Sequence, residues 1–450
     1  MTRRPLTLAA IAAATMLAGC QAYHADPLRP ASVALADPDQ AVLSADAAKI
    51  DRPYLTPQPI DLNQPLTPNA LAIITVLENP DLKALRAKNG VTDAQAFAAM
   101  LLPDPQIALN FDKILSGPDV FNAYGGSLGI DINALLTAKV ARQIGTAQKR
   151  QVRLDLAWAE WQSAGQARLQ GVRVFALAQQ LALAKESAAL AERQFAVVAS
   201  AAGRGDVAGG EVDSRRQAAL DAGDKLRLAE NGLVTARGEL NRQLGLAPNA
   251  VISVAPAPDP APALDAEQLF ALALERRLDL AALRAGYQSA EAEVHKSILG
   301  QFPTLSLSFN YARDTADNKT IGPAIGFSLP LFNRNRGAIR TATATREQLK
   351  AEYEARLFQT RADIRAAVDG LTTVRSQSAA LQAQLPALER YAAATARAAR
   401  NGDLAPITAS AAEQVLRDRQ LTLLQLRQQA AEQTIALELL TGSLSEGWTK

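Results

Sequence analysis

An internal duplication constrains this sequence more than any other feature. Ile325 follows Leu128 by 197 positions, and both residues belong to short apolar alternations that lead into long helix-compatible segments. Gly402 follows Gly205 by the same 197 positions, so the two copies stay in register over those long segments. A repeat of this length predicts that one supersecondary unit is built twice within the chain.

Each copy is predicted to contain a β-hairpin. Apolar and polar residues alternate at 107–111 and 305–311, and each run is followed by a polar loop and a second alternating run, at 128–132 and 325–329. Alternation with a period of two over such short runs indicates strands with one apolar and one polar face. Four strands from one chain are too few to bury both faces of a sheet.

Long helical hairpins follow the predicted strands. The segments 139–200 and 336–400 would each form a helix of roughly 90–100 Å at a rise of 1.5 Å per residue. Turns that contain glycine end both segments, and return helices are predicted at about 211–244 and 407–440. Because helices of this length need a partner, the sequence predicts a mainly α fold with coiled-coil pairs and a small β part.

Composition marks the boundaries between the parts of the chain. Prolines recur through residues 20–65, which favours an extended tether along the surface over a packed domain. Alanine and proline alternate at 247–263, as is typical of a linker. The predicted parts are a signal peptide at 1–19, a tether at 20–65, a first repeat at 66–246, a linker at 247–263, a second repeat at 264–442 and a tail at 443–450.

The N-terminus has the composition of a targeting signal. Arg3 and Arg4 precede an apolar run at 6–17 that is too short to span a bilayer, and Cys20 is the single cysteine of the chain. The residues before Cys20 resemble a bacterial lipoprotein signal, which implies cleavage before Cys20 and attachment of lipid to its thiol. Gln21 at the next position resembles lipoproteins that are sent on to the outer membrane. An ordinary secretory signal with an incidental cysteine is the alternative.

Charge and residue usage exclude several classes of function. Removal of residues 1–19 takes away two of the 47 basic residues, so 45 basic residues balance 45 acidic ones and leave no electrostatic footprint for nucleic acid. His24 and His295 are the only histidines, and with one cysteine they predict neither a metal site nor a cofactor. Because no phosphate loop, nucleophile elbow or metalloprotease motif occurs, we expect no enzyme activity.

The succession of parts resembles a known family. A lipoprotein signal, a proline-rich tether and a unit of helix, β-hairpin, long helix, glycine turn and return helix that occurs twice are similar to the TolC-type outer membrane efflux proteins. The residues at 330–337, with the sequence Pro-Leu-Phe-Asn-Arg-Asn-Arg-Gly, resemble the junction between strand and helix in the CzcC-like cation-efflux branch of that family. The sequence Pro-Asp-Pro at 103–105 is similar to the same branch.

The resemblance implies a fold and a function. Three chains would close a twelve-stranded transmembrane β-barrel that continues into a periplasmic α-barrel of twelve helices. This homotrimer would conduct substrates passively through the outer membrane, with a periplasmic adaptor (membrane fusion) protein and an inner-membrane pump of the RND type as partners. Metal cations are one class of substrate, and organic toxicants or drugs are the alternative. A periplasmic adaptor and a structural coiled-coil lipoprotein are the competing functions outside the channel class.

The resemblance also implies candidate site residues. The adaptor would contact the turns between the long and the return helices, whose residues are Arg204, Gly205, Asp206, Val207, Asn401, Gly402, Asp403 and Leu404. These residues are also common turn formers, which is the alternative interpretation. The family can carry an acidic ring early in the last return helix, where this chain has Thr408 and Ala411; Glu211 and Asp213 of the first copy would supply the constriction instead. Acidic residues that stabilise a helix N-terminus are the alternative for that pair.

Overall fold

The computed structural model describes residues 23–256 and 265–448. The chain divides into two compact units, Met1–Asp37 and Pro38–Lys450. In the first unit, the described residues contain one short helix, α2 (Ala31–Ala34). Cys20, the predicted signal peptide and residues 257–264 of the predicted linker lie outside the described residues, so the lipidation of Cys20 stays a prediction.

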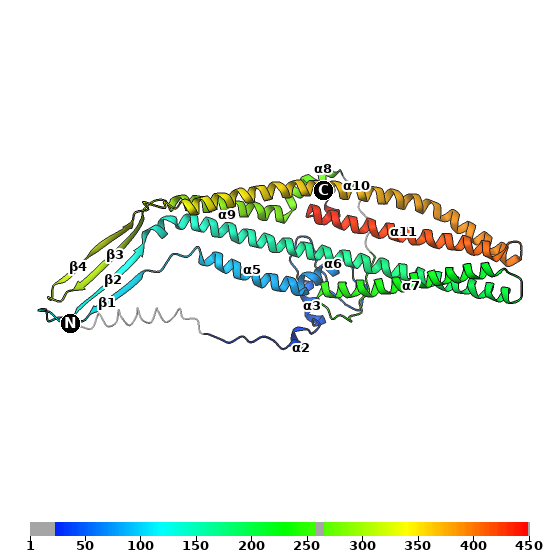
Figure 1. Ribbon diagram of the computed structural model, residues 1–450, viewed down its shortest axis with the longest axis horizontal. Coiled ribbons are helices and arrows are strands. Elements are labelled where there is room, and N and C mark those ends of the chain that lie inside the picture. The colour runs from blue at the N-terminus through cyan, green and yellow to red at the C-terminus, as the bar shows by residue number, and fades with distance from the viewer. Residues whose placement is uncertain (1–22, 257–264, 449–450) are drawn as a thin grey trace. The chain divides into compact units, whose positions relative to one another are not determined.

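The second unit contains the same succession of elements twice (Figure 1). The first set is α4 (Pro68–Glu78), α5 (Pro80–Ala98), β1 (Gln106–Asp112), β2 (Ala123–Asp131), α6 (Ile132–Gly203) and α7 (Gly209–Leu244). The second set is α8 (Ala266–Arg276), α9 (Leu278–Leu299), β3 (Thr304–Arg313), β4 (Lys319–Ser328), α10 (Arg336–Asn401) and α11 (Pro406–Thr441). The helix α3 (Gln40–Ala47) precedes the first set, and the 3-10 helix η1 (Ser445–Gly447) follows the second. A mainly helical fold with a small sheet is therefore confirmed.

The four strands form one antiparallel sheet in the order β1-β2-β3-β4. The strands β2 and β3 come from different copies of the repeat, and they pair from Tyr124 opposite Arg313 to Asp131 opposite Ser306. The sheet therefore joins the two copies. Within the described residues, β1 and β4 have a neighbouring strand on one side only, so both edges of the sheet expose backbone donors and acceptors.

The long helices run away from the sheet in two antiparallel pairs. Within the second unit, α6 packs along α7 and α10 packs along α11, and the turns that join each pair lie at the end opposite the strands (Figure 1). With 72 residues in α6 and 66 in α10, the two helices are roughly 100 Å long at 1.5 Å per residue. Asp131 caps the N-terminus of α6, because its side chain accepts hydrogen bonds from the backbone N–H groups of Asn133 and Ala134.

The short helix pairs α4–α5 and α8–α9 are attached to the return helices in the same way. Asn79, between α4 and α5, donates a hydrogen bond from Nδ2 to the carbonyl oxygen of Gln243 in α7 (2.8 Å). Arg277, between α8 and α9, donates from Nη1 to the carbonyl oxygen of Leu440 in α11 (3.1 Å). Leu440 follows Gln243 by 197 positions, so the two copies use the same acceptor at a helix end that would otherwise lack a partner.

Glycine ends both return helices at matching positions. Gly245 and Gly442 have φ values of +70°, the left-handed conformation that glycine adopts without steric cost. A Cβ atom at Gly245 would lie 2.5 Å from the carbonyl oxygen of Glu78. Both the backbone conformation and the close approach of α4 therefore require glycine at position 245.

Residues 43–60 differ from the expected extended tether. Leu43, Ala47 and Ile60 are buried, and they belong to one core cluster with Leu71 of α4 and Leu240 of α7. The prolines of this stretch lie between the apolar residues without preventing their burial. The segment therefore packs as part of the second unit, and the prediction of an extended tether was wrong for these residues. Proline content suggested an extended chain, whereas the spacing of the apolar side chains decides their burial.

Candidate functional site

One face of the sheet consists of exposed apolar side chains. In its central row Leu307 lies opposite Ile130 of β2 and Ile325 of β4, and the exposed fractions of Leu307 and Ile325 are 41% and 65%. The other large apolar side chains in the same register are Ile107, Leu109, Phe111, Tyr124, Leu128, Leu305, Phe309, Tyr311, Ile321 and Phe327. An exposed apolar surface of this extent on a sheet marks contact with another apolar phase or partner.

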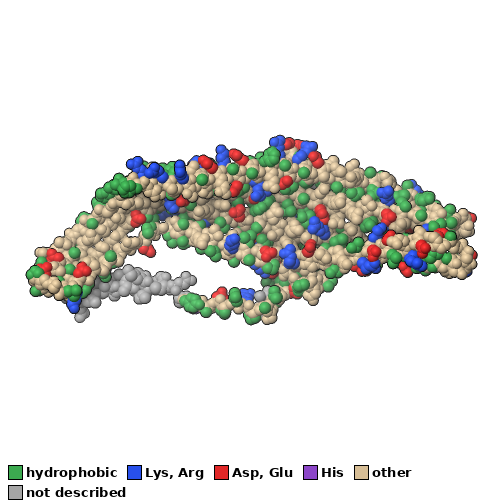
Figure 2. All heavy atoms as spheres, viewed as in Figure 1, with side chains coloured by type: hydrophobic (Ala, Val, Ile, Leu, Met, Phe, Trp, Pro, Cys, Tyr) green, Lys and Arg blue, Asp and Glu red, His purple; other side chains and the backbone are tan. Residues whose placement is uncertain are grey.

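The opposite face of the sheet carries small and polar side chains. The row next to the central one contains Gly129, Ser308 and Ala324, and Asn110 and Ser306 lie in other rows of the same face. Charged residues occur in the strands only near their ends, and Figure 2 shows charged side chains at the loop end of the strands and at the beginning of the helices. The sheet is therefore apolar on one side, polar on the other, and free of charge along its middle.

The strand lengths fit the thickness of a membrane. A transmembrane β-strand needs about 9–11 residues, and β2 has 9 residues while β3 and β4 have 10 each; β1, at the edge of the sheet, is shorter, with 7. None of the helices in the described part of the chain is long and apolar enough to cross a membrane. Three of the four strands thus have the length of a membrane-spanning strand.

The turn between α6 and α7 has a defined backbone geometry. Gly205 has a φ value of +82°, and the backbone N–H of Asp206 donates to the carbonyl oxygen of Ala201 (3.0 Å). Arg204 is exposed, and its Nε donates to Oδ2 of Asp206 (3.1 Å). Val207 is half-buried, so the turn presents a charged pair outward and an apolar side chain toward the helices.

The turn between α10 and α11 repeats this geometry. Gly402 has a φ value of +84°, and the backbone N–H of Asp403 donates to the carbonyl oxygen of Ala398 (2.9 Å). Asn401 and Asp403 are exposed and Leu404 is half-buried, as the matching residues are in the first turn. The equivalence of the two turns therefore extends from the sequence to individual hydrogen bonds. Their contact with an adaptor stays a prediction.

A groove lies between the turn that joins α6 to α7 and the beginning of α11. A cavity of about 470 Å³ lies between the end of α6, the beginning of α7 and the beginning of α11. Its apolar lining includes Val197, Val207 and Ile407, and Glu211 and Arg215 lie at the same groove. The two helical hairpins therefore form one composite surface at the end of the unit that is farthest from the sheet.

The predicted constriction residues are placed differently from one another. Glu211 is half-buried and lines the groove, whereas Asp213 is exposed and forms an ion pair with Arg216 (3.5 Å). Thr408 is exposed in the first turn of α11, and its backbone N–H donates to the carbonyl oxygen of Ala405 (3.0 Å). Within one chain, the structure does not bring these three side chains to one point, so a ring formed from them requires further copies of the chain.

Groups that could bind a metal ion are absent from the described residues. No cluster of three or more histidine, cysteine, aspartate or glutamate side chains has suitable geometry in residues 23–256 and 265–448. His295 lies on α9 and borders a groove of about 1100 Å³ beside Lys139 and Arg142 of α6. Its neighbours there are mainly basic, which is unsuitable for a cation.

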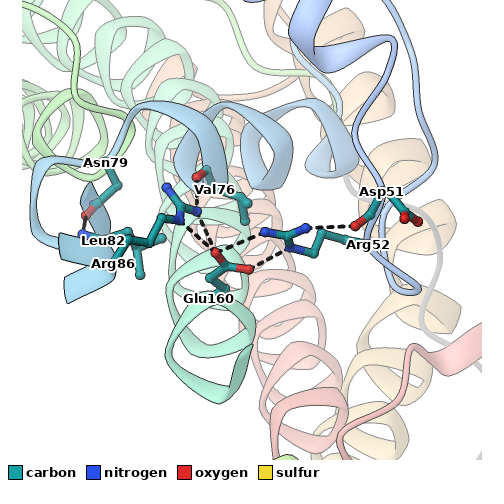
Figure 3. A network of polar contacts seen from close by, with 7 residues as sticks. All are labelled: Asp51, Arg52, Val76, Asn79, Leu82, Arg86 and Glu160. Atoms are coloured by element: carbon teal, nitrogen blue, oxygen red, sulfur yellow. Dashed lines mark hydrogen bonds and ion pairs between the residues drawn. The ribbon is translucent and has the colours of Figure 1, made fainter. Parts of the chain in front are cut away.

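Sequence reasoning missed a buried carboxylate that ties together three segments (Figure 3). The side chain of Glu160 in α6 is 3% exposed, and it accepts hydrogen bonds from Nε of Arg52 (2.6 Å) and Nη2 of Arg86 (2.7 Å). Arg86 of α5 also donates to the carbonyl oxygen of Val76 in α4. Burial alone would raise the pKa of Glu160, but the two arginines outweigh burial and hold this pKa below its usual range.

No local signal in the sequence could have shown that these three residues meet. Arg52 and Arg86 are 108 and 74 positions away from Glu160, and each of the three is an ordinary surface residue by type. The one cue was that the position of Glu160 falls among aromatic and small residues, between Trp158 and Trp161.

Sequence comparisons relate the chain to outer membrane efflux proteins. Residues 269–443 match the model of the family described as outer membrane efflux protein. The cobalt-zinc-cadmium resistance protein CzcC of Cupriavidus metallidurans is 26% identical over 376 residues, which cover 80% of this chain and 85% of that protein.

Solved structures share the fold. The crystal structure of CusC has a TM-score of 0.66 at 17% identity and covers 90% of this chain and 99% of that one. The outer-membrane channel OprN has a TM-score of 0.71 at 16% identity and covers 95% of this chain and 100% of that one. The similarity to channel structures therefore spans both copies of the repeat.

Proposed function

We propose that this chain, which belongs to the outer membrane efflux protein family, assembles as a homotrimer that conducts substrates passively across the outer membrane. The observation that carries the proposal is the sheet, which is apolar on one face, small and polar on the other, and open at both edges. An open sheet edge cannot remain unpaired in lipid, because no water is present to satisfy its backbone groups.

Closure by three chains satisfies both edges. The four strands alternate in direction, so β1 and β4 are antiparallel to one another, and β4 of one copy can pair with β1 of the next as an antiparallel neighbour. Three copies give a barrel of twelve strands without an edge. Leu307 and its row would then face lipid, and Ser308 and its row would line a water-filled passage.

The helices would extend the passage into the periplasm. Each copy supplies α6, α7, α10 and α11 at the same level, so three copies would supply the twelve helices of an α-barrel. The turns at Gly205 and Gly402 would be the contact for a periplasmic adaptor, because they form one composite, conformationally fixed surface at the end of the molecule away from the sheet. An inner-membrane pump of the RND type would supply the energy for transport.

The N-terminus would attach the trimer to the membrane. The expected lipid on Cys20 would insert into the outer membrane, and the following residues would connect it to the packed segment that begins near α3. A single acyl chain binds membranes only weakly, so an anchor of several chains together with the barrel would hold the protein there.

Metal cations are the substrate class that we propose. The sequence relative named for resistance to cobalt, zinc and cadmium covers 80% of this chain. The described residues hold no metal-binding cluster, so the selection of the cation would take place in the pump rather than in the channel.

A deletion strain tests the substrate. We expect it to become sensitive to divalent transition metals and to regain tolerance with the intact gene, because the substrate could no longer leave through the outer membrane. Growth would be measured over a panel of metal salts and organic toxicants, with a complemented strain as the control. Unchanged tolerance of every metal together with sensitivity to organic toxicants would contradict the proposed substrate and favour organic efflux.

Neutralising the candidate constriction should change ion selectivity. The double variant Glu211→Gln with Asp213→Asn removes six carboxylates from a trimer, and we expect the permeability ratio of cations to anions in planar bilayers to fall several-fold. The control is Glu230→Gln, an exposed carboxylate farther along α7. An unchanged ratio in the double variant would show that these acids serve only the N-terminus of α7.

A further inference from the structure

The junction between β4 and α10 exposes large apolar side chains that nothing in the described chain covers. Leu329, Leu331 and Phe332 are 60%, 64% and 90% exposed. Leu329 follows Ile325 and Phe327 at the same spacing, so it extends the apolar face just beyond the end of β4. The chain then turns at Pro330, where the backbone N–H of Leu331 donates to the carbonyl oxygen of Leu329 (2.8 Å). The exposure of these apolar side chains next to the proposed lipid-facing surface is explained if lipid also covers them.

The junction is fixed by the fold rather than loosely attached. Asn335 has a φ value of +52°, and its Nδ2 donates to the carbonyl oxygen of Ser297 in α9 (2.7 Å). Nη2 of Arg336 donates to the carbonyl oxygen of Phe332 (3.0 Å). Two anchors, one to a neighbouring helix and one within the loop, therefore hold the apolar side chains outward.

The other connections between helices and strands present apolar side chains at the same end of the sheet. Leu101 and Leu102 precede β1 and are 58% and 44% exposed, and Phe302 precedes β3 and is 60% exposed. Leu136 in the first turns of α6 is 71% exposed. The apolar surface of the junction thus recurs where the strands meet the helices.

Basic side chains follow the apolar junction directly. Arg334, Arg336 and Arg340 are exposed, and none of them forms an ion pair with a carboxylate among residues 23–256 and 265–448. Arg336 donates instead to the backbone carbonyl oxygens of Phe332 and Asn333. Arg336 and Arg340 are roughly 6 Å apart along α10, which is similar to the thickness of about 5–8 Å of one headgroup layer. Figure 2 shows hydrophobic side chains gathered where β4 passes into α10, with basic side chains beyond them.

We infer that this junction binds the periplasmic leaflet of the outer membrane, with Phe332 and Leu331 in the acyl region and Arg334, Arg336 and Arg340 on the phosphates of anionic phospholipids. The inference rests on the proposed function, because it needs the sheet to span the membrane. Guanidinium groups bind phosphate oxygens in bidentate fashion, and three of them beyond an apolar loop match the order of acyl chain and headgroup. The junction would thereby fix the depth at which the barrel sits.

A second copy of this chain is the competing occupant of the surface. In a closed barrel, β4 lies beside β1 of the next copy, and the residues before β1 include Asp104. One carboxylate does not balance three arginines, and the continuity of Leu329 with the lipid-facing row favours lipid. The experiment separates the two occupants.

Fluorescent labels at single cysteines test where the junction lies. In a Cys20→Ser chain purified and inserted into vesicles, Phe332→Cys, Phe309→Cys and Phe358→Cys place one label each at the junction, on the apolar sheet face, and on the exposed surface of α10. We expect brominated phospholipids to quench the labels at 332 and 309 and to leave the label at 358 unquenched. The quenched pair would place both the sheet and the junction in contact with lipid.

The labels at 309 and 332 distinguish a failure of the proposed function from a failure of the inference alone. An unquenched label at 309 would overturn the proposed function and the inference with it. A quenched label at 309 with an unquenched label at 332 would overturn the inference alone. In that second case, blue-shifted emission from the label at 332 would identify the neighbouring copy as the occupant, and emission typical of water would show that the junction is bare.

Removal of the arginines tests the headgroup contact. In the variant Arg334→Gln, Arg336→Gln and Arg340→Gln, with the label at 332, brominated phosphatidylglycerol should lose its advantage over brominated phosphatidylcholine, which we expect to be at least about fivefold in the parent. The matched control, Arg390→Gln, Arg397→Gln and Arg400→Gln at the far end of α10, should keep that advantage. An equal preference in parent and junction variant would contradict binding to anionic headgroups.

Discussion

Replacing Leu307 with arginine is expected to prevent stable insertion of the proposed trimer into the outer membrane. Leu307 lies in the middle of β3, opposite Ile130 and Ile325, on the face that we assign to lipid. An arginine at the bilayer midplane costs about 2–4 kcal/mol per barrel strand, so three copies would cost roughly 6–12 kcal/mol. The measurement is the amount of heat-resistant trimer in outer-membrane fractions.

The neighbouring residue provides a matched control. Ser308→Arg places the same charge at the same depth on the opposite face, where Gly129 and Ala324 leave room beside it. The proposed passage is water-filled, so this variant should insert at close to the parent level. Equal loss of trimer in both variants, or in neither, would contradict the assignment of the two faces.

Replacing Glu160 with alanine is expected to destabilise the helical unit by about 1–3 kcal/mol, because Arg52 and Arg86 would lose the hydrogen bonds to the buried carboxylate, although both guanidinium groups remain partly exposed to water. The measurement is urea unfolding followed by circular dichroism of the detergent-solubilised protein. Glu192→Ala, an exposed position on the same helix, should change the free energy of unfolding by less than about 0.5 kcal/mol. A similar small effect at Glu160 would mean that the cluster is dispensable.

The same cluster predicts a dependence of stability on pH. The pKa of Glu160 is lower in the folded chain than the value of 4.5 for an ordinary glutamate. Its contribution is therefore complete above about pH 4.5, and it is lost as the pH falls through the lower folded pKa. Below pH 4.5 the parent should lose stability more steeply than Glu160→Gln, and parallel curves would rule out this origin.

The repeat made much of the fold predictable. A constant offset of 197 positions located both glycine turns, and the structure shows the same backbone hydrogen bonds at Asp206 and Asp403. Strands were predictable because apolar alternation with a period of two has no other common cause in so short a run. The pairing of β2 with β3 followed from neither signal, since it depends on the placement of two copies in space.

Other parts were not predictable from local patterns. The proline content of residues 20–65 indicated an extended chain, although Leu43, Ala47 and Ile50 are spaced by four and three positions, as on one face of a helix. That spacing was the available signal for their burial. The groove at the helical turns could not be foreseen, because Val197 and Ile407 meet only when the two hairpins lie side by side.

Single-channel recording from the purified trimer in a planar bilayer tests the central claim most directly. A channel closed by three copies predicts discrete current steps of one size, which appear with the parent and with Ser308→Arg and are absent with Leu307→Arg. A narrow constriction at the helical turns would make the current steps small, and the Glu211→Gln, Asp213→Asn variant removes its charge. A purified trimer that inserts and yet carries no current, in the parent and in that double variant alike, would contradict the account.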